Sequence, residues 1–388
     1  MDSTLPMVYV LIGVTTGLFV VQSGYWLLMY ARPLRKPYRK TPKGQKEKAH
    51  TPPVSVVLYA GHDTEKLQDQ LLALLGQDYP CYEVVVVTDN ASDESEGALK
   101  ILEKTHANFY HTYIPEGAKY VSRKKLALTI GIKAAKHDIL LFTEAHCLPV
   151  SKKWIASFSQ AYLPETEIVQ GLCAYRYTEG FMHRFIAYDN LLDGMQCLSA
   201  TLARHPFTGS GRNLSYRKSL FFNKKGYYQS LALHDGDDDL FVNESATPRN
   251  TRIVYSPESV TEMPPVQQFE QWMEGKFAHA VTRRRYKGGM PLLFRMETLS
   301  YFLFFGLGIA TIIAGVTDEW GLSIAAGVLI LVRHIVKAVI LHKASALFHQ
   351  KPVTAWLFVL EFIHPLCEAY IYVRQLFRHK REYTFRLK

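Results

Sequence analysis

The chain has 388 residues, enough for one large domain or two, and its net charge of +10 would suit a nucleic-acid-binding protein. Many of its basic residues, however, crowd two stretches beside apolar runs, at 32–43 and 374–381, as in the positive-inside pattern, so we expect membrane lipids and no nucleic acid as partners. The five cysteines are scattered and form no CxxC pair, which argues against a disulfide framework or a structural zinc site.

The uncharged apolar run at 7–30 has the roughly 20 residues that a bilayer span needs, with Tyr and Trp near its end. Asp2 precedes this run and a basic cluster follows it, which is the reverse of a cleaved signal peptide. We therefore expect residues 1–31 to be a retained transmembrane signal-anchor with its N-terminus outside. Residues 32–52, rich in Pro and Lys, are expected to form a basic linker.

Three short apolar runs, VSVVLYA at 54–60, EVVVVTD at 83–89 and DILLFTEA at 138–145, are typical of parallel strands buried on both faces. Sequences with helical spacing separate them. The alternation predicts an α/β domain over 53–290 with a Rossmann-like, mostly parallel, doubly wound sheet that binds ligands at its carboxyl edge. We expect an interfacial helix near 266–290 at the end of this domain.

A second membrane region is predicted over 291–388. Apolar runs separated by a short acidic tip indicate a helical hairpin at 298–342, and its charged residues Arg333, His334 and Lys337 should face protein or the interface. A third apolar segment, at 353–377, contains several polar residues, and as a full span it would place the basic tail outside. We therefore expect a re-entrant or interfacial helix there, followed by a basic tail on the inner side.

Acidic residues follow the first two predicted strands, where the carboxyl ends of parallel strands share one edge. Asp63, shortly after Ala60 at the end of the first strand, can bind a nucleoside or cap the next helix. Asp89 ends the second strand at the crevice where nucleotides bind. Both aspartates are candidate donor ligands.

Two further clusters flank the third strand. Lys124 and Lys125 begin the helix before it, where positive charge is unfavourable unless an anion such as a diphosphate is bound; a solvated charge run is the alternative. Glu144 and His146 end the strand, and residues two apart in a strand point the same way. Carboxylate and imidazole suit Mn²⁺, Mg²⁺ or Zn²⁺, although an ExH triplet is also common as a plain polar strand end.

The segment HDGDDDL at 234–240 places four acids within five positions. Their mutual repulsion needs a metal, a basic partner, or one carboxyl with a raised pKa for base chemistry. A calcium loop of the EF-hand type lacks its other ligands here. A catalytic carboxylate is therefore the favoured interpretation.

Together these segments resemble the family 2 glycosyltransferases of GT-A fold, the group of cellulose synthase, hyaluronan synthase and ceramide glucosyltransferase. The similar stretches include QDYPCYEVVVVTDNASDES, KKLALTIGIKAAKHDILLFTEAHC, FTGSGRNLSYRKSLF and DGDDDLF, in this order. The resemblance implies a membrane-bound hexosyltransferase that uses a nucleotide-sugar, UDP-linked by preference, and a divalent metal, Mn²⁺ or Mg²⁺.

The resemblance also implies roles for individual residues. Asp237 or Asp238 would be the catalytic base, with Asp237 preferred because it lies three residues before Leu240. Glu144 and His146 would take the place of the metal-binding DxD motif. The implied donor-binding residues are Ala60, Asp63, Asp89, Lys124, Lys125 and Glu144, and the implied acceptor-side residues are Gly209, Gly211 and Asn213.

Two departures from the family pattern bear on the product. The DxD motif is Glu-Ala-His, and the QxxRW motif of processive members is missing, with Gly275 and Ala278 where Gln and Arg are expected. Lys276 and Arg283 could replace the lost phosphate contacts, or could lie against lipid headgroups. These departures favour transfer of one sugar to a lipid or lipid-linked acceptor.

The expected protein is thus a multi-pass enzyme of a bacterial cytoplasmic membrane, acting in the cell envelope with its catalytic domain in the cytosol. The same-class alternative is a processive polysaccharide synthase. An alternative of another class is an inactive membrane scaffold that retains the fold.

Overall fold

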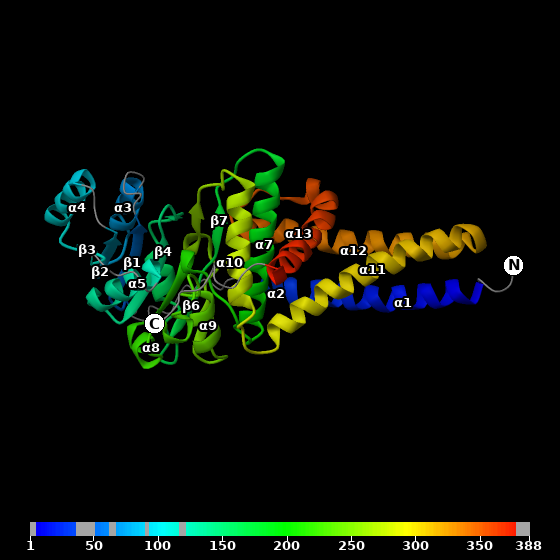
Figure 1. Cartoon of the computed structure of the whole chain (residues 1–388), viewed down its shortest axis with the longest axis horizontal. Coiled ribbons are helices and arrows are strands. Elements are labelled where there is room, and N and C mark those ends of the chain that lie inside the picture. The colour runs from blue at the N-terminus through cyan, green and yellow to red at the C-terminus, as the bar shows by residue number, and fades with distance from the viewer. Residues whose placement is uncertain (1–4, 36–50, 62–66, 90–92, 116–121, 378–388) are drawn as a thin grey trace, which may run out of the picture.

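The computed structural model describes residues 5–35, 51–61, 67–89, 93–115 and 122–377. An α/β domain lies at one end, and long apolar helices from both ends of the chain project from the other (Figure 1). Most of the predicted linker at 32–52, as well as Asp63, lies outside the described residues; within that linker, Arg32–Arg35 form a short helix, α2.

A seven-stranded sheet forms the centre of the α/β domain, in the order β3-β2-β1-β4-β8-β6-β9. Its first four strands are parallel to one another, and β8 runs antiparallel to both β4 and β6. The mostly parallel sheet was predicted, whereas the antiparallel part was not. The strands are β1 Val54–Gly61, β2 Tyr82–Thr88, β3 Phe109–Tyr113, β4 Ile139–Glu144, β6 Ile168–Gln170, β8 Leu214–Arg217 and β9 Thr251–Ile253.

The apolar runs form strands because both of their faces are covered. Val56 and Leu58 of β1 pack against one layer of helices, and Val57 between them packs against the opposite layer. Helix α5 approaches the sheet closely at Gly131, where an added Cβ would lie 2.7 Å from a methyl group of Val57. The flanking helices are α3 Leu67–Leu75, α4 Asp93–Thr105, α5 Arg123–Ala134, α6 Trp154–Ser159, α8 Lys218–Asn223 and α9 Asp239–Ser245.

A layer between the sheet and the long apolar helices contains elements that the sequence did not reveal. A small second sheet has the order β5-β10-β7, with β5 Leu148–Pro149, β7 Cys173–Tyr175 and β10 Thr261–Met263. Beside it lies α7, Phe181–Leu202. A helix, α10 (Phe269–Arg283), lies where an interfacial helix was expected, and it packs against the last helix of the described chain.

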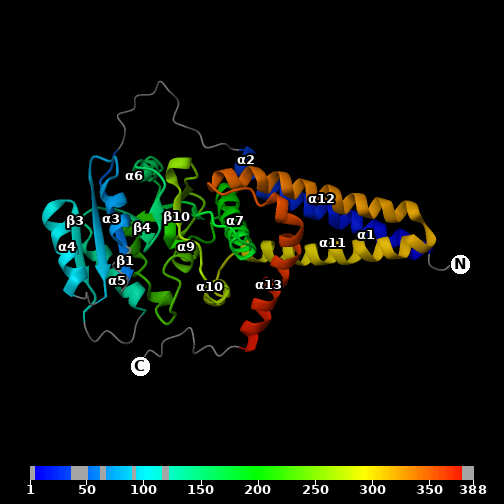
Figure 2. The ribbon, with the colours of Figure 1, turned by 90° about the horizontal axis from the view of Figure 1, so that it is seen from above.

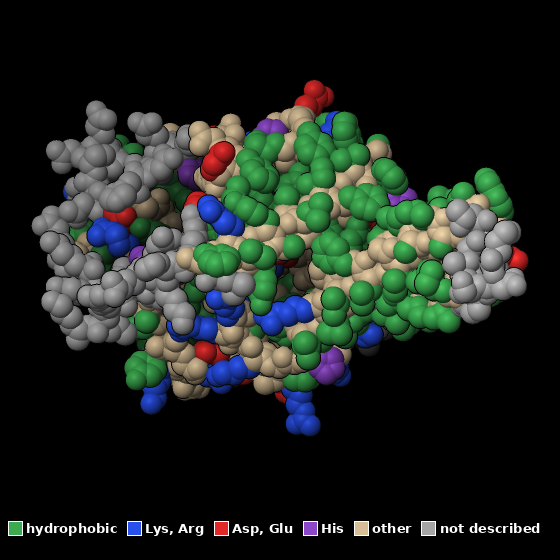
Figure 3. Space-filling model, turned by 45° about the vertical axis from the view of Figure 1, so that its right-hand side comes forward, with side chains coloured by type: hydrophobic (Ala, Val, Ile, Leu, Met, Phe, Trp, Pro, Cys, Tyr) green, Lys and Arg blue, Asp and Glu red, His purple; other side chains and the backbone are tan. Residues whose placement is uncertain are grey.

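Four helices in the described part of the chain are long and apolar enough to cross a membrane. Helix α1 (Leu5–Gly24), continued by the π-helix η1 (Tyr25–Tyr30), lies beside α11 (Met290–Asp318) and α12 (Trp320–Leu347), and these three project together (Figures 1 and 2). Hydrophobic side chains cover this bundle (Figure 3). The hairpin is longer than the predicted 298–342.

The fourth long helix, α13 (Leu357–Phe377), runs across the base of the bundle instead of along it (Figure 2). It supplies the partner for the charged residues of α12. The carboxylate of Glu361 pairs with Arg333, accepts a hydrogen bond from Lys337 at 3.1 Å and lies 2.7 Å from Nδ1 of His334. These side chains therefore face protein, as expected for charges at membrane depth.

Candidate active site

Three candidate residues meet at the carboxyl edge of the sheet, around the ammonium of Lys124. This Nζ lies 2.7 Å from Oε1 of Glu144, the last residue of β4, and 3.0 Å from Oδ2 of Asp237, in the loop before α9. Lys124 lies in the first turn of α5, whose start is placed beside β4 by the doubly wound topology. Arg212 adds a second cation, with its Nε 3.2 Å from Oε2 of Glu144.

These cations determine the charge of Glu144. Burial opposes its ionisation, but Lys124 and Arg212 outweigh burial and lower the pKa of Glu144 to about 2. Burial likewise opposes the charge of Lys124, yet Asp237 and Glu144 raise its pKa well above the usual lysine value. Glu144 is thus an anionic oxygen ligand, surrounded by positive charge, at the edge where a nucleotide would bind.

The next two acids differ in their bonding. Asp238 caps α9: its Oδ1 accepts a hydrogen bond from the Asp239 N–H at 2.7 Å, and its Oδ2 accepts one from the Gly211 N–H at 2.7 Å. Burial, with the charges of Asp237 and Asp239, raises the pKa of Asp238 to about 7. Burial also raises the pKa of Asp237, which Lys124 partly offsets. Oδ1 of Asp237 is buried and has no hydrogen-bond partner in the described part of the chain.

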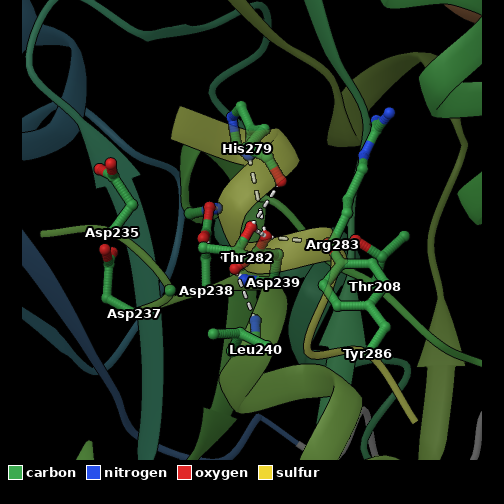
Figure 4. Close-up of polar contacts among 12 residues, drawn as sticks. Thr208, Asp235, Asp237, Asp238, Asp239, Leu240, His279, Thr282, Arg283 and Tyr286 are labelled. Atoms are coloured by element: carbon green, nitrogen blue, oxygen red, sulfur yellow. Dashed lines mark hydrogen bonds and ion pairs between the residues drawn. The ribbon is translucent and has the colours of Figure 1, made fainter. Parts of the chain in front are cut away.

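Asp239 points away from this cluster, toward α10 (Figure 4). Its Oδ2 accepts hydrogen bonds from Thr282 and, at 2.8 Å, from the hydroxyl of Tyr286, and it lies 3.8 Å from Nδ1 of His279. Burial opposes ionisation of Asp239, but these three partners lower its pKa. Asp238 and Asp239 are neighbours in the chain, yet their carboxylates lie in two different environments.

On the nucleotide side, Asp89 is buried at the end of β2. Its carboxylate accepts hydrogen bonds from the Tyr59 hydroxyl at 2.9 Å and from Nε of Arg123 at 3.0 Å. Burial and the bond to Asp89 raise the pKa of Tyr59 to about 12. The predicted donor residue Ala60 packs in the core beneath this edge.

Two predicted donor or metal residues are placed differently from expectation. The ammonium of Lys125 turns away from Lys124 and donates to the carbonyls of Ser230, Leu233 and Asp235 at 2.5, 3.0 and 2.7 Å, so it holds the loop that leads to the acidic cluster. The strand ends at Glu144, and His146 has a φ of 72°, so the two-residue alternation of a strand does not relate their side chains.

The residues of the predicted acceptor-side loop also lie in different environments. Gly211 lies against the acidic cluster, where an added Cβ would be 3.4 Å from Oδ2 of Asp238, and Gly209 would meet Val242 at 2.8 Å. The side chain of Asn213 is buried, accepting from the indole of Trp154 and donating to two backbone carbonyls. Asn213 therefore stabilises the loop through buried hydrogen bonds.

Lys276 and Arg283 have carboxylate partners in the protein. The ammonium of Lys276 lies 2.5 Å from Asp189, 3.0 Å from Asp193 and 3.1 Å from Glu368 of α13, and Arg283 lies 2.8 Å from Asp193. Both cations are therefore paired within the protein.

The described residues contain one group of three ligand-type side chains close enough to hold a metal, and it is formed by Asp189, His364 and Glu368. The ammonium of Lys276 already bonds to both of its carboxylates.

A cavity of about 680 Å³ lies between the α/β domain and the long apolar helices. Gly209, Arg212, Asp239 and His279 line its catalytic end. Its other walls come from η1, α7, α11, α12 and α13 and include Trp26, Tyr30, Phe294, Tyr301, Phe302 and Phe348. Since Arg212 both lines the cavity and contacts Glu144, the cavity adjoins the acidic cluster.

The sequence analysis did not identify Tyr59, Arg123, Arg212 or His279 as site residues. Arg212 lies between two residues of the loop that was singled out, Tyr59 precedes the candidate Ala60, and Arg123 precedes the candidate Lys124. Their segments were therefore recognised, but no pattern marked these three side chains themselves.

Comparison with known proteins identifies the family. The profile of glycosyl transferase family 21 matches residues 11–384, which is nearly the whole chain. The chain belongs to glycosyl transferase family 21. It is therefore a glycosyltransferase, as predicted from the ordered motifs. The sequence analysis had named family 2, in a group that includes ceramide glucosyltransferase. The family that matches is family 21.

One solved structure supports a GT-A-like fold for this family 21 glycosyltransferase. The mannosyltransferase PcManGT from Pyrobaculum calidifontis, in complex with GDP-Man and Mn²⁺, aligns over 94% of this chain and 99% of its own, with 21% identity and a TM-score of 0.54. TarS from S. aureus in complex with UDP-GlcNAc aligns over 76% of this chain and 88% of its own, with 15% identity and a TM-score of 0.41. Among curated protein sequences, none matches significantly.

Proposed function

We propose that this family 21 glycosyltransferase transfers a single hexose from a nucleotide-sugar, preferably a UDP-sugar, to a hydroxyl of a lipid or lipid-linked acceptor at the cytoplasmic face of a membrane. The cavity of about 680 Å³ carries this proposal. It offers aromatic walls from the membrane helices, such as Trp26 and Phe294, for an apolar chain, and it adjoins the acidic cluster through Arg212. A soluble acceptor would need no such aromatic walls.

The donor would bind at the carboxyl edge of the sheet. We assign Asp89 and Asp63, which follow β2 and β1 in the sequence, to the nucleoside, and Lys124 and Arg212 to the diphosphate, because both cations already neutralise Glu144 there. Lys125 is omitted from this set because its ammonium already donates hydrogen bonds to three backbone carbonyls.

Glu144 and His146 would hold a Mn²⁺ or Mg²⁺ ion. The ionised carboxylate of Glu144 fits a divalent cation, with diphosphate oxygens filling the remaining positions. His146 is assigned as the second ligand for the chemistry of its imidazole, since strand alternation does not direct it toward Glu144. The solved complex of PcManGT contains GDP-Man and Mn²⁺, which supports a metal in this fold. When bound, the ion would stabilise negative charge on the leaving nucleoside diphosphate.

Asp237 is the proposed base. Its Oδ1 has no partner among the described residues, so it can take the acceptor's proton, whereas both oxygens of Asp238 already accept backbone hydrogen bonds. The acceptor oxygen then bonds to the anomeric carbon on the face opposite the diphosphate, and the carbon–oxygen bond to the diphosphate breaks. This single displacement inverts the anomeric configuration.

For the membrane topology we propose an outside N-terminus, a bundle of α1, α11 and α12 across the bilayer, and α13 at the cytoplasmic interface. The transverse course of α13 and its contacts with α10 support the interfacial position. This arrangement keeps the α/β domain and the basic tail in the cytosol, in agreement with the positive-inside pattern.

The missing QxxRW motif and the aromatic walls of the cavity both favour one transfer over processive synthesis. A polymer would need a polar channel through the bundle. An inactive scaffold would not need the buried ion pairs of the Lys124–Glu144–Asp237 cluster.

The test is transfer by the purified full chain from a panel of UDP- and GDP-sugars into a membrane lipid extract, with and without Mn²⁺, read by mass spectrometry of the products. Ala280 lines the cavity, and Ala280→Phe should reduce transfer to lipid at least ~10-fold while slow donor hydrolysis persists. The control, Gln271→Phe, changes an exposed residue of the same helix outside the cavity.

Absence of donor binding and hydrolysis under every condition would refute the enzymatic proposal. Equal loss in both phenylalanine variants, or polymer as the product, would refute the assignment of the acceptor.

A further inference from the structure

A second, smaller pocket lies on the membrane side of the α/β domain, apart from the active site and its large cavity. Its volume is about 120 Å³, and it is enclosed by the first turns of α7 and the connection from α12 to α13. Figure 2 shows the end of α12 beside α7. The residues that follow β7 complete its wall.

The lining of this pocket is basic. Arg176, His183, Arg184 and Lys351 all contribute, and the lining contains no aspartate or glutamate. In the described part of the chain, no carboxylate lies within ion-pair distance of Arg176, Arg184 or Lys351. Cation–π contacts hold two of them in place: Nζ of Lys351 lies 3.8 Å from the ring centre of Tyr177, and the Arg184 guanidinium lies 5.1 Å from that of Trp356.

A buried amide with no partner also lies in this pocket. Gln350 is only 9% exposed, yet neither its Nε2 nor its Oε1 has a hydrogen-bond partner among the described residues. Nδ1 of His183 is buried and without a partner in the same way. Buried polar groups in native proteins nearly always have partners, so these atoms indicate a ligand with polar atoms of its own. The start of the 22-residue helix α7 adds positive potential for an anion.

The rim of the pocket indicates where that ligand comes from. Trp356 lines the pocket, and the ring centre of Phe181 lies 5.8 Å from that of Trp356; these two side chains are 39% and 41% exposed. Exposed aromatic residues beside membrane helices are typical of the headgroup level of a bilayer. The cations, the unpartnered amide and this rim therefore match a phosphate group attached to a lipid chain.

We infer that this pocket binds the phosphate headgroup of an anionic phospholipid, separately from the acceptor, and so fixes the α/β domain on the bilayer surface. The inference rests on the proposed membrane placement and not on the transferase activity. Lys351 and Arg184 would neutralise the phosphate, and the Gln350 amide would donate to one of its oxygens.

Binding is measured on delipidated full-length protein in neutral detergent, by native mass spectrometry with short-chain phosphatidylglycerol, short-chain phosphatidylcholine and inorganic phosphate as separate probes. Wild type should prefer phosphatidylglycerol. Lys351→Ala should weaken its binding about fivefold, since one interfacial cation contributes about 1 kcal/mol. Gln350→Met, which leaves net charge unchanged, should weaken it about two- to tenfold, through loss of one hydrogen bond.

The matched control is Lys343→Ala, which removes an exposed cation of α12 outside the pocket and should change the affinity less than twofold. Equal weakening in Lys343→Ala and Lys351→Ala, or unchanged binding in Gln350→Met, would overturn the site in favour of general surface attraction. Inorganic phosphate binding as tightly as phosphatidylglycerol would overturn the lipid assignment. Because binding is read directly, an inactive transferase that still binds the lipid would contradict only the proposed function.

Discussion

The ammonium of Lys124 lies 3.0 Å from Oδ2 of Asp237, and this contact joins the loop before α9 to the carboxyl edge of the sheet. The same ammonium also neutralises Glu144 at 2.7 Å. One cation therefore serves the proposed base and the proposed metal ligand together, and the metal and diphosphate would enter an environment whose charges are already balanced.

Replacing Lys124 by methionine should lower kcat/KM by ~10²-fold or more, because a buried charged hydrogen-bond partner of two carboxylates is lost. The variant should also gain more thermal stability from added Mn²⁺ than wild type does, since Glu144 then lacks its main counter-ion. The neighbouring Lys125→Met is the control. It should destabilise the fold through the loop of Ser230 and Leu233, with no greater response to Mn²⁺.

The placement of Lys124 and Glu144 at one edge could be predicted because it follows from topology, whereas the role of Asp237 was implied by the family resemblance. Apolar β-branched runs fix where parallel strands end, and those ends share one edge. The expected strands at 54–60 and 83–89 agree with β1 and β2 to within one residue at each end.

What could not be predicted depends on single side-chain directions and on contacts between distant segments. Lys125 follows Lys124 directly, but neighbouring residues on a helix point about 100° apart, so only one of them reaches the site. A positive φ at His146 breaks the alternation that the ExH spacing assumed. The partners of Lys276 come from α7 and α13, whose approach leaves no local pattern.

Asp237→Asn should reduce kcat by ~10²–10⁴-fold with little change in donor affinity, because a general base acts on the acceptor's proton and not on the donor. Asp238→Asn should cost much less activity, since asparagine is also a good helix N-cap. Turnover is measured with donor binding in parallel. If Asp238→Asn were the more damaging change, the base would have to be reassigned to Asp238.

The pH dependence of stability should reveal Asp238. Its pKa is about 7 in the folded protein, against an ordinary value of 3.8, so between these values the folded state holds a proton that the unfolded state has lost. Stability should therefore fall as pH rises from about 4 to about 7 and then level off, with a contribution of at most about 1.4 kcal/mol per pH unit. Denaturant titrations of wild type and Asp238→Asn isolate this contribution as a difference, and parallel curves would contradict it.

Glu361→Gln should strongly destabilise the membrane region. It leaves Arg333 and Lys337 buried without their shared carboxylate, which typically costs about 3–5 kcal/mol. Thermal stability in detergent, followed by size-exclusion chromatography after heating, should fall clearly. Glu368→Gln is the control on the same helix, since Lys276 retains Asp189 and Asp193. Equal losses in both variants would show that the Glu361 cluster contributes no more to stability than the contact of Glu368 does.

Arg212 lies where the donor site adjoins the cavity, so its kinetic effect decides to which substrate it belongs. Its contact with Glu144 predicts a role at the diphosphate. Arg212→Gln should therefore raise the donor KM by ~10–100-fold, which corresponds to the usual contribution of a hydrogen bond to a charged group. The acceptor KM should stay nearly unchanged. Arg217→Gln is the matched control, because Arg217 pairs with Asp138 on the far end of β4. A rise confined to the acceptor KM would place Arg212 in the acceptor cavity, and the diphosphate would then depend on Lys124 alone.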